Sequence, residues 1–65
     1  MNLPNDPLLL MSVVNTKLRD YYASLDALSD DLNVPAAAIK EKLAAIGYAY
    51  DAGRNQFIRA PQASV

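Results

Sequence analysis

Apolar residues in the first third of the chain recur at intervals of three and four residues, which is the period of an amphipathic helix. The series comprises Leu10, Val13, Val14, Leu18, Tyr21 and Tyr22. The charged residues Lys17, Arg19 and Asp20 fall on the other side. Asn5 or Asp6 can cap the N-terminus, and Pro7 suits the first helical position because its missing N–H needs no partner there. The pattern predicts a long helix that starts at about Pro7.

Two shorter helices are predicted between residues 24 and 47. The apolar face of the first comprises Leu25, Leu28 and Leu32, and that of the second comprises Ile39, Leu43 and Ile46. Ser24 is a good cap for the first helix, and Gly47 ends the second. Between them, Asn33 tolerates the left-handed conformation that ends helices, and Pro35 fixes the dihedral from which the next helix starts. Residues 33–35 therefore predict a tight corner between two helices.

After Gly47 the period of the pattern changes to two. Tyr48 and Tyr50 point to one side and Ala49 to the other, and residues 56–58 read as a return strand. Between them, residues 51–55 contain the Asp, Gly and Asn of a turn. A short β-hairpin with a loop of about five residues is expected, with residues 60–65 as a flexible tail.

The order helix, helix, corner, helix, hairpin predicts a mainly α fold. It is the order of a three-helix helix-turn-helix core, winged-helix-like, with a short C-terminal β-hairpin. The seam of the two helices around the corner should comprise Leu28, Leu32, Val34, Ile39 and Leu43. Leu28, Ile39, Leu43 and Phe57 should be buried together. We expect residues 1–59 to form one domain.

The composition supports a small folded protein and excludes several locations. The chain has 65 residues, 52% of them apolar, and no cysteine, so one domain without disulfides is expected. The apolar run at residues 8–14 follows no positive charge and is far shorter than the roughly 20 residues of a membrane span. These features predict a cytoplasmic protein with no membrane association.

The residues needed for catalysis are nearly absent, so we expect no enzymatic activity, cofactor or metal. There is no histidine and no cysteine, so no imidazole base can activate a serine. Asp30 and Asp31 are adjacent and point to different sides of a helix. The only glycines are Gly47 and Gly53, so no glycine-rich phosphate loop exists.

Several short segments of the sequence also occur in a known family. They are MNLPNDP at the start, NTKLRDYY at residues 15–22, SLD at 24–26, and IGYAYD followed by RNQF near the end. Through them the chain resembles, over about residues 1–58, a family of short bacterial proteins catalogued as domain of unknown function 4250. The resemblance implies no activity and offers no catalytic residues. The segments shared with the family contain these candidate functional residues: Asn15, Lys17, Arg19, Asp20, Arg54, Asn55 and Gln56.

DNA binding is one of two hypotheses for the function. The candidate contacts are Lys40 on the third helix and Arg54, Asn55, Gln56 and Arg59 on the hairpin. Against it, the net charge is −1, and the outward side of the third helix offers Ala37, Glu41 and Ala44, where base-reading helices usually carry Arg, Lys, Asn or Gln. The preference of asparagine for turns also explains Asn55 in the hairpin loop without any contact to DNA. DNA binding by a dimer is therefore the second choice.

Protein–protein contact, most simply self-association, is the preferred hypothesis. The first helix shows apolar residues on more than one face, and its candidate interface comprises Leu9, Leu10, Met11 and Val14. A domain of this size should leave part of that surface uncovered, and symmetric dimers are the commonest remedy. Asn15 interrupts the apolar series, and we expect it to make a structural hydrogen bond to backbone at the hairpin or the corner.

Overall fold

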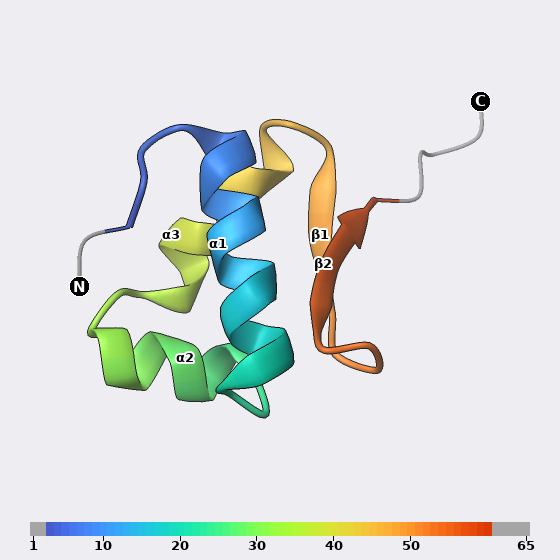
Figure 1. Ribbon diagram of the computed structural model, residues 1–65. Coiled ribbons are helices and arrows are strands. Elements are labelled where there is room, and N and C mark those ends of the chain that lie inside the picture. Colours follow the sequence, from blue (N-terminus) through green and yellow to red (C-terminus); the bar gives the residue numbers. More distant parts are fainter. Residues whose placement is uncertain (1–2, 61–65) are drawn as a thin grey trace.

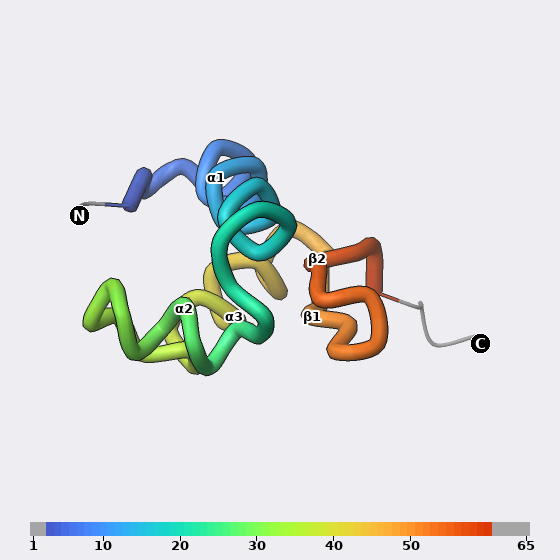
Figure 2. Tube along the Cα trace, turned by 60° about the horizontal axis from the view of Figure 1, so that its bottom comes forward, coloured from blue at the N-terminus to red at the C-terminus, as the bar shows by residue number. Residues whose placement is uncertain are grey.

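The computed structural model describes residues 3–60, which form three helices followed by a two-stranded antiparallel hairpin (Figure 1). The elements are α1 (Pro7–Asp20), α2 (Leu25–Leu32), α3 (Ala36–Ala44), β1 (Tyr48–Asp51) and β2 (Gln56–Arg59). In Figure 1, α2 runs across the lower end of α1. The turned view of Figure 2 shows α1 lying over α3 and the hairpin, with α3 beside β1. The predicted mainly α fold, with its C-terminal hairpin, is confirmed.

The ends of α1 follow from local hydrogen bonds. The Asp6 side chain accepts a bond from the Leu8 N–H, and Pro7 occupies the first turn, as expected. At the other end, the N–H groups of Tyr21 and Tyr22 both donate to the Lys17 carbonyl. The Tyr21 bond is the ordinary i→i−4 bond of an α-helix, whereas the Tyr22 bond spans five residues and closes the C-terminal end of α1.

The corner between α2 and α3 is a turn of residues 33–35. Ser24 caps α2, its Oγ accepting from the Ala27 N–H at 3.1 Å. Asn33 ends α2 in the left-handed conformation, with φ +56°, as the sequence predicts. The Ser29 hydroxyl donates to the Val34 carbonyl at 2.6 Å. That bond holds the turn against the helix that precedes it.

The core joins all three helices to the hairpin. Among residues 3–60, the buried apolar side chains are Leu10, Val14, Leu18, Leu25, Leu28, Ile39, Leu43 and Phe57. The predicted association of Leu28, Ile39, Leu43 and Phe57 is confirmed. Burying these side chains removes apolar area from water, and this is the main stabilising contribution available to so short a chain.

The hairpin is one residue tighter than expected. Asp51 belongs to β1 and pairs with Gln56, so the loop is residues 52–55. The Asp51 carboxylate accepts hydrogen bonds from the N–H groups of Gly53 and Arg54. Ala60, which the sequence places in the tail, donates its N–H to the Gly47 carbonyl at 2.8 Å and extends the ladder. Residues 61–65 of the predicted tail lie outside the described residues.

Candidate functional site

The outward face of α1 is much less apolar than the sequence suggests. Leu10 and Val14, expected at an interface, are 2% and 0% exposed because they pack in the core of their own chain. Met11 is partly buried against that core. Leu9 is 56% exposed, and its neighbour Leu8, which was not among the candidates, is 60% exposed. The prediction is therefore corrected: this face offers two leucines and not a broad apolar stripe.

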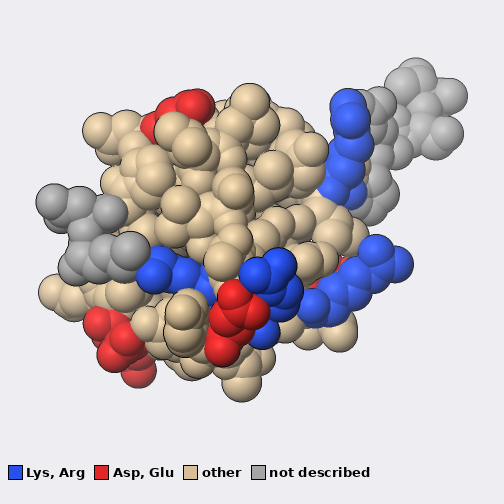
Figure 3. Space-filling view, in the orientation of Figure 1, with Lys and Arg blue, Asp and Glu red and all other residues tan. Residues whose placement is uncertain are grey.

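The exposed leucines lie on a stretch of α1 with few charges, the nearest being Asp6 at its N-terminus. Residues 7–16 of α1 include no charged side chain, and Ser12 and Thr16 are exposed beside the leucines. Figure 3 shows that most of the upper half of this side of the molecule is neutral. An apolar patch of two side chains is within what a soluble monomer normally exposes. This face alone does not demand a partner.

Asn15 fastens α1 to the hairpin. Its Nδ2 donates to the Phe57 carbonyl at 3.1 Å, and its Oδ1 accepts from the Phe57 N–H at 2.7 Å. The side-chain amide thus bonds to Phe57 as the peptide of a neighbouring strand would. The expected structural hydrogen bond is confirmed, and it is doubled. It also covers the outer edge of β2 at Phe57.

Asn55 makes a second connection and is corrected as a nucleic-acid candidate. Its Nδ2 donates to the carbonyls of Leu18 and Tyr22 at 3.0 and 2.9 Å, which closes the C-terminal end of α1. Its Oδ1 accepts from the Tyr50 hydroxyl at 2.6 Å. The Tyr50 oxygen in turn accepts from the Leu25 N–H at 3.2 Å. The amide of Asn55 is therefore used within the fold.

The sequence pattern does not predict the role of Tyr50, since it indicates only an apolar contact of the hairpin. Its ring does pack on Phe57, with the centroids 5.5 Å apart. Its hydroxyl, however, links the start of α2 to Asn55. No signal in the sequence announces this bond, because the partners lie 25 and 5 residues away in different elements.

The remaining nucleic-acid candidates are dispersed. Lys40, Arg54 and Arg59 are exposed, and Gln56 is partly buried. Arg54 is 3.7 Å from the Asp51 carboxylate, which offsets its charge. On α3, Ala37, Glu41 and Ala44 are exposed as predicted. In Figure 3 several basic side chains lie along a band across the lower half of this face with acidic ones among them, and one lies apart at the upper right. That distribution is unlike the continuous basic surface of most DNA-binding domains.

Two exposed acid groups have local partners that affect titration. Arg19 and Asp20 form an ion pair at 2.9 Å, which lowers the pKa of the Asp20 carboxyl and raises that of Arg19 through a direct hydrogen bond. The Tyr22 hydroxyl donates to the Asp31 carboxylate, and this bond raises the pKa of Tyr22 because it stabilises the neutral phenol. The first pair joins consecutive residues of α1, whereas the second joins the segment after α1 to α2.

The outer edge of β1, which faces away from β2, carries backbone groups without hydrogen-bond partners in the described part of the chain. The Gly47–Ala60 bond and the Asn15–Phe57 bonds fix which peptide groups face inward. Because Phe57 turns its N–H and carbonyl away from β1, its opposite residue Tyr50 turns its own away from β2. Tyr48, two residues before Tyr50, also turns its N–H and carbonyl away from β2. Within residues 3–60, no hydrogen bond reaches the peptide N–H or carbonyl of either tyrosine.

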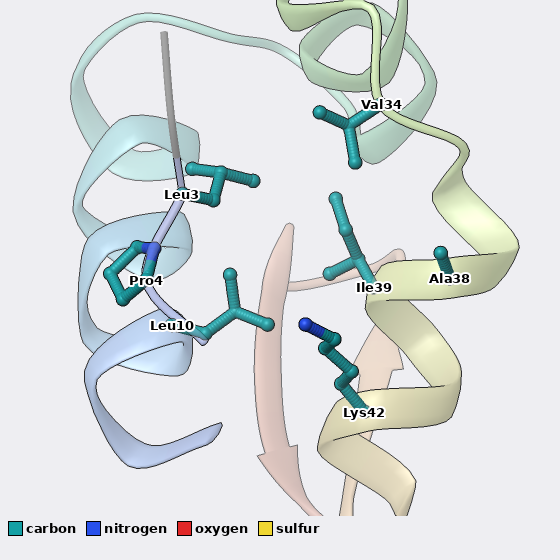
Figure 4. Close-up of a pocket in the computed structure, with 7 residues that line it drawn as sticks. All are labelled: Leu3, Pro4, Leu10, Val34, Ala38, Ile39 and Lys42. Carbon is teal, nitrogen blue, oxygen red and sulfur yellow. The ribbon is translucent and has the colours of Figure 1, made fainter. Parts of the chain in front are cut away.

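A groove opens on the surface beside the N-terminal segment. It has a volume of about 250 Å³ and lies between the N-terminal segment, α1, the corner and α3. Its lining comprises Leu3, Pro4, Leu10, Val34, Ala38, Ile39 and Lys42 (Figure 4). Lys42 is its only charged residue, and the Nζ atom is 3.4 Å from the Asn5 side-chain oxygen. The groove is thus apolar with one cationic side chain.

Residues 3–60 contain neither a cluster of metal-binding side chains nor a membrane-spanning helix. Within residues 3–60, no group of three or more His, Cys, Asp or Glu side chains is placed to hold a metal ion. The helices of the same part of the chain all fall short of the length and apolar character required to cross a membrane.

Comparison with known proteins places the chain in a family. No curated protein and no solved structure matched it. A family model described as domain of unknown function (DUF4250) matches residues 4–57. The match covers α1 to α3, β1 and the start of β2, with Asn15, Tyr50 and Asn55 inside it. The chain therefore belongs to the DUF4250 family.

Proposed function

We propose that the protein is a non-catalytic interaction module that pairs with a second copy of itself through the outer edge of β1. The observation that carries this proposal is the pair of unbonded peptide groups at Tyr48 and Tyr50. Natural proteins usually protect such edges with proline, lysine, a bulge or a covering segment. β1 is short, which limits how much it can pair, but the exposed residue between its two tyrosines is Ala49, and it provides none of these protections.

The edge is complementary to itself. If two copies of β1 run antiparallel about a two-fold axis at Ala49, Tyr48 of one copy stands opposite Tyr50 of the other. Each such pair exchanges two hydrogen bonds, so about four form in total. At the axis the two Ala49 residues meet as a non-hydrogen-bonded pair, where the backbones approach most closely and a small side chain fits. The hairpins would then join into one four-stranded sheet.

The expected dimer is weak. About four backbone hydrogen bonds stabilise the pair by roughly 2–6 kcal/mol in total, since each contributes about 0.5–1.5 kcal/mol. Loss of rigid-body freedom opposes association by an estimated 4–15 kcal/mol. Contacts beside the strands, including partly exposed Ile58, must supply the difference. We therefore expect a weak, transient dimer, as for other small interfaces.

Sedimentation velocity and amide exchange together test the proposal. At concentrations of hundreds of micromolar, the sedimentation coefficient should rise towards that of a dimer. The amide protons of Tyr48 and Tyr50 should exchange more slowly as concentration rises, because pairing protects them. A protein that stays monomeric across this range, with unchanged exchange, contradicts self-association.

A charge at the axis should abolish the dimer without unfolding the monomer. Ala49 is exposed, so Ala49→Glu leaves the core unchanged but places two carboxylates face to face in the pair. Ala52→Glu is the matched control, since Ala52 is exposed in the loop outside the strand. Loss of the dimer in the first variant alone supports pairing through β1. Equal dimerisation in both variants would show that the interface is not β1, and the exposed Leu8 and Leu9 would be the next candidate.

DNA binding by the same dimer is the second candidate function. The arrangement that favours it is α2, a turn at residues 33–35, α3 and then a hairpin, which is the order of winged helix-turn-helix domains. A dimer would also double the exposed cations Lys40 and Arg59. Against it stand Glu41 on the exposed side of α3 and the ion pair that occupies Arg54.

Fluorescence anisotropy with a mixed-sequence duplex measures this second function. We expect binding no tighter than roughly micromolar at physiological salt, because few cations are available to contact phosphates. Lys40→Gln and Arg59→Gln should weaken what binding exists to a similar small degree. Nanomolar, sequence-selective binding would reverse the order of the two proposals.

A further inference from the structure

The groove beside the corner combines features that the self-association proposal does not use. Three parts of the chain that are distant in sequence build it: the segment at Leu3 and Pro4, the start of α1 at Leu10, and residues 34–42. The side chains of Leu3, Val34 and Ile39 point toward one another across it (Figure 4). An apolar lining of this kind favours a ligand with a hydrocarbon portion.

Lys42 gives the groove a charge preference. In Figure 4 its side chain extends from α3 toward Leu10 and Ile39, so the ammonium group lies beside the apolar lining. The ion pairs of the described residues are Arg19–Asp20 and Arg54–Asp51, so Lys42 belongs to neither. Its contact is the neutral oxygen of Asn5, at the long distance of 3.4 Å. A carboxylate would be a stronger partner for it than an amide.

The volume restricts the size of the ligand. A groove of about 250 Å³ corresponds to roughly eight water-sized volumes of about 30 Å³ each. This is close to the number of non-hydrogen atoms in a short fatty acid such as hexanoate. A ligand of this size fills the groove, whereas most of a longer chain would extend beyond its apolar lining.

We infer that the groove is a binding site for a short aliphatic monocarboxylate, with the hydrocarbon chain between Leu3, Val34 and Ile39 and the carboxylate on Lys42. The inference does not depend on self-association, since the groove involves α3 and the N-terminal segment and not the edge of β1. A ligand of so few atoms binds weakly, and the expected dissociation constant is about millimolar.

A nuclear magnetic resonance titration with three probes of equal chain length tests both parts of the site. Sodium hexanoate should shift the amide signals of Val34, Ala38, Ile39 and Lys42 in a saturable manner. Hexan-1-ol should bind more weakly because it lacks the charge, and hexylammonium should not bind. The inference is overturned if hexanoate leaves these signals unchanged, or if hexylammonium binds as well as hexanoate.

Two variants separate the roles of charge and space. Lys42→Gln should weaken hexanoate binding about two- to fivefold, the range expected for a solvent-exposed ion pair. Ala38→Leu should abolish binding, because the larger side chain occupies the groove. Ala37→Leu is the matched control, since Ala37 is exposed on the adjacent position of α3 and is not part of the lining. Unchanged hexanoate binding in Lys42→Gln, or in Ala38→Leu, rejects the assigned site.

Discussion

Replacing Leu43 by alanine is expected to lower the free energy of unfolding by about 2–5 kcal/mol. Leu43 is 0% exposed in the centre of the core that joins α1, α2, α3 and β2. Truncation removes apolar contacts and leaves a cavity that the surrounding helices can fill only in part. A domain of 65 residues has a total stability of roughly 3–10 kcal/mol, so much of the stability would be lost.

Urea denaturation followed by circular dichroism measures this loss. Lys40→Ala, on the exposed side of the same helix, controls for changes in α3 itself and should alter stability by no more than about 0.5 kcal/mol. If the Leu43 variant unfolds at the same urea concentration as the Lys40 variant, α3 does not pack as the structure shows.

Replacing Asn15 by alanine should be the most damaging change of a polar residue. Its amide bonds both the N–H and the carbonyl of Phe57 in a partly buried position. Without it, both peptide groups lose their partner, and a buried unsatisfied group costs about 1–3 kcal/mol. We expect a loss of that order, together with a broadened or shifted Phe57 amide signal as the hairpin loosens from α1.

Two further variants test whether the Asn15–Phe57 hydrogen bonds cause the loss of stability. Asn15→Asp keeps an acceptor for the Phe57 N–H but places an oxygen against the Phe57 carbonyl, so it should not restore stability. Thr16→Ala is the control, because the Thr16 hydroxyl bonds only to the exposed Ser12 carbonyl within its own helix. Equal stability of the Asn15 and Thr16 variants would show that the amide is dispensable.

The same asparagine links stability to the proposed dimer. By occupying the outer edge of β2 at Phe57, Asn15 leaves β1 as the strand with free peptide groups. Loosening the hairpin in the Asn15 variant would also expose β2. That variant should therefore associate less specifically than the parent, although its β1 edge is unchanged.

Local chemistry accounts for the elements that the sequence predicted. Asp6, Pro7, Ser24 and Asn33 act on backbone groups within a few residues of themselves, so their effects can be read along the chain. The apolar periodicity likewise identified Leu28, Ile39 and Leu43 as core residues, because period is a property of one helix. The order of the elements then indicated the mainly α fold with a C-terminal hairpin.

Only the tertiary structure decided which surfaces remain free. Leu8, Leu9, Leu10 and Val14 are all apolar, and it is the packing of α1 in the shared core that buries the last two and leaves the first two exposed. The amides of Asn15 and Asn55 bond to backbone groups 42 and 37 residues away. The groove arises because the N-terminal segment meets α3. These outcomes depend on contacts between elements, and a pattern of residue types carries no distance between elements, so the sequence alone left them open.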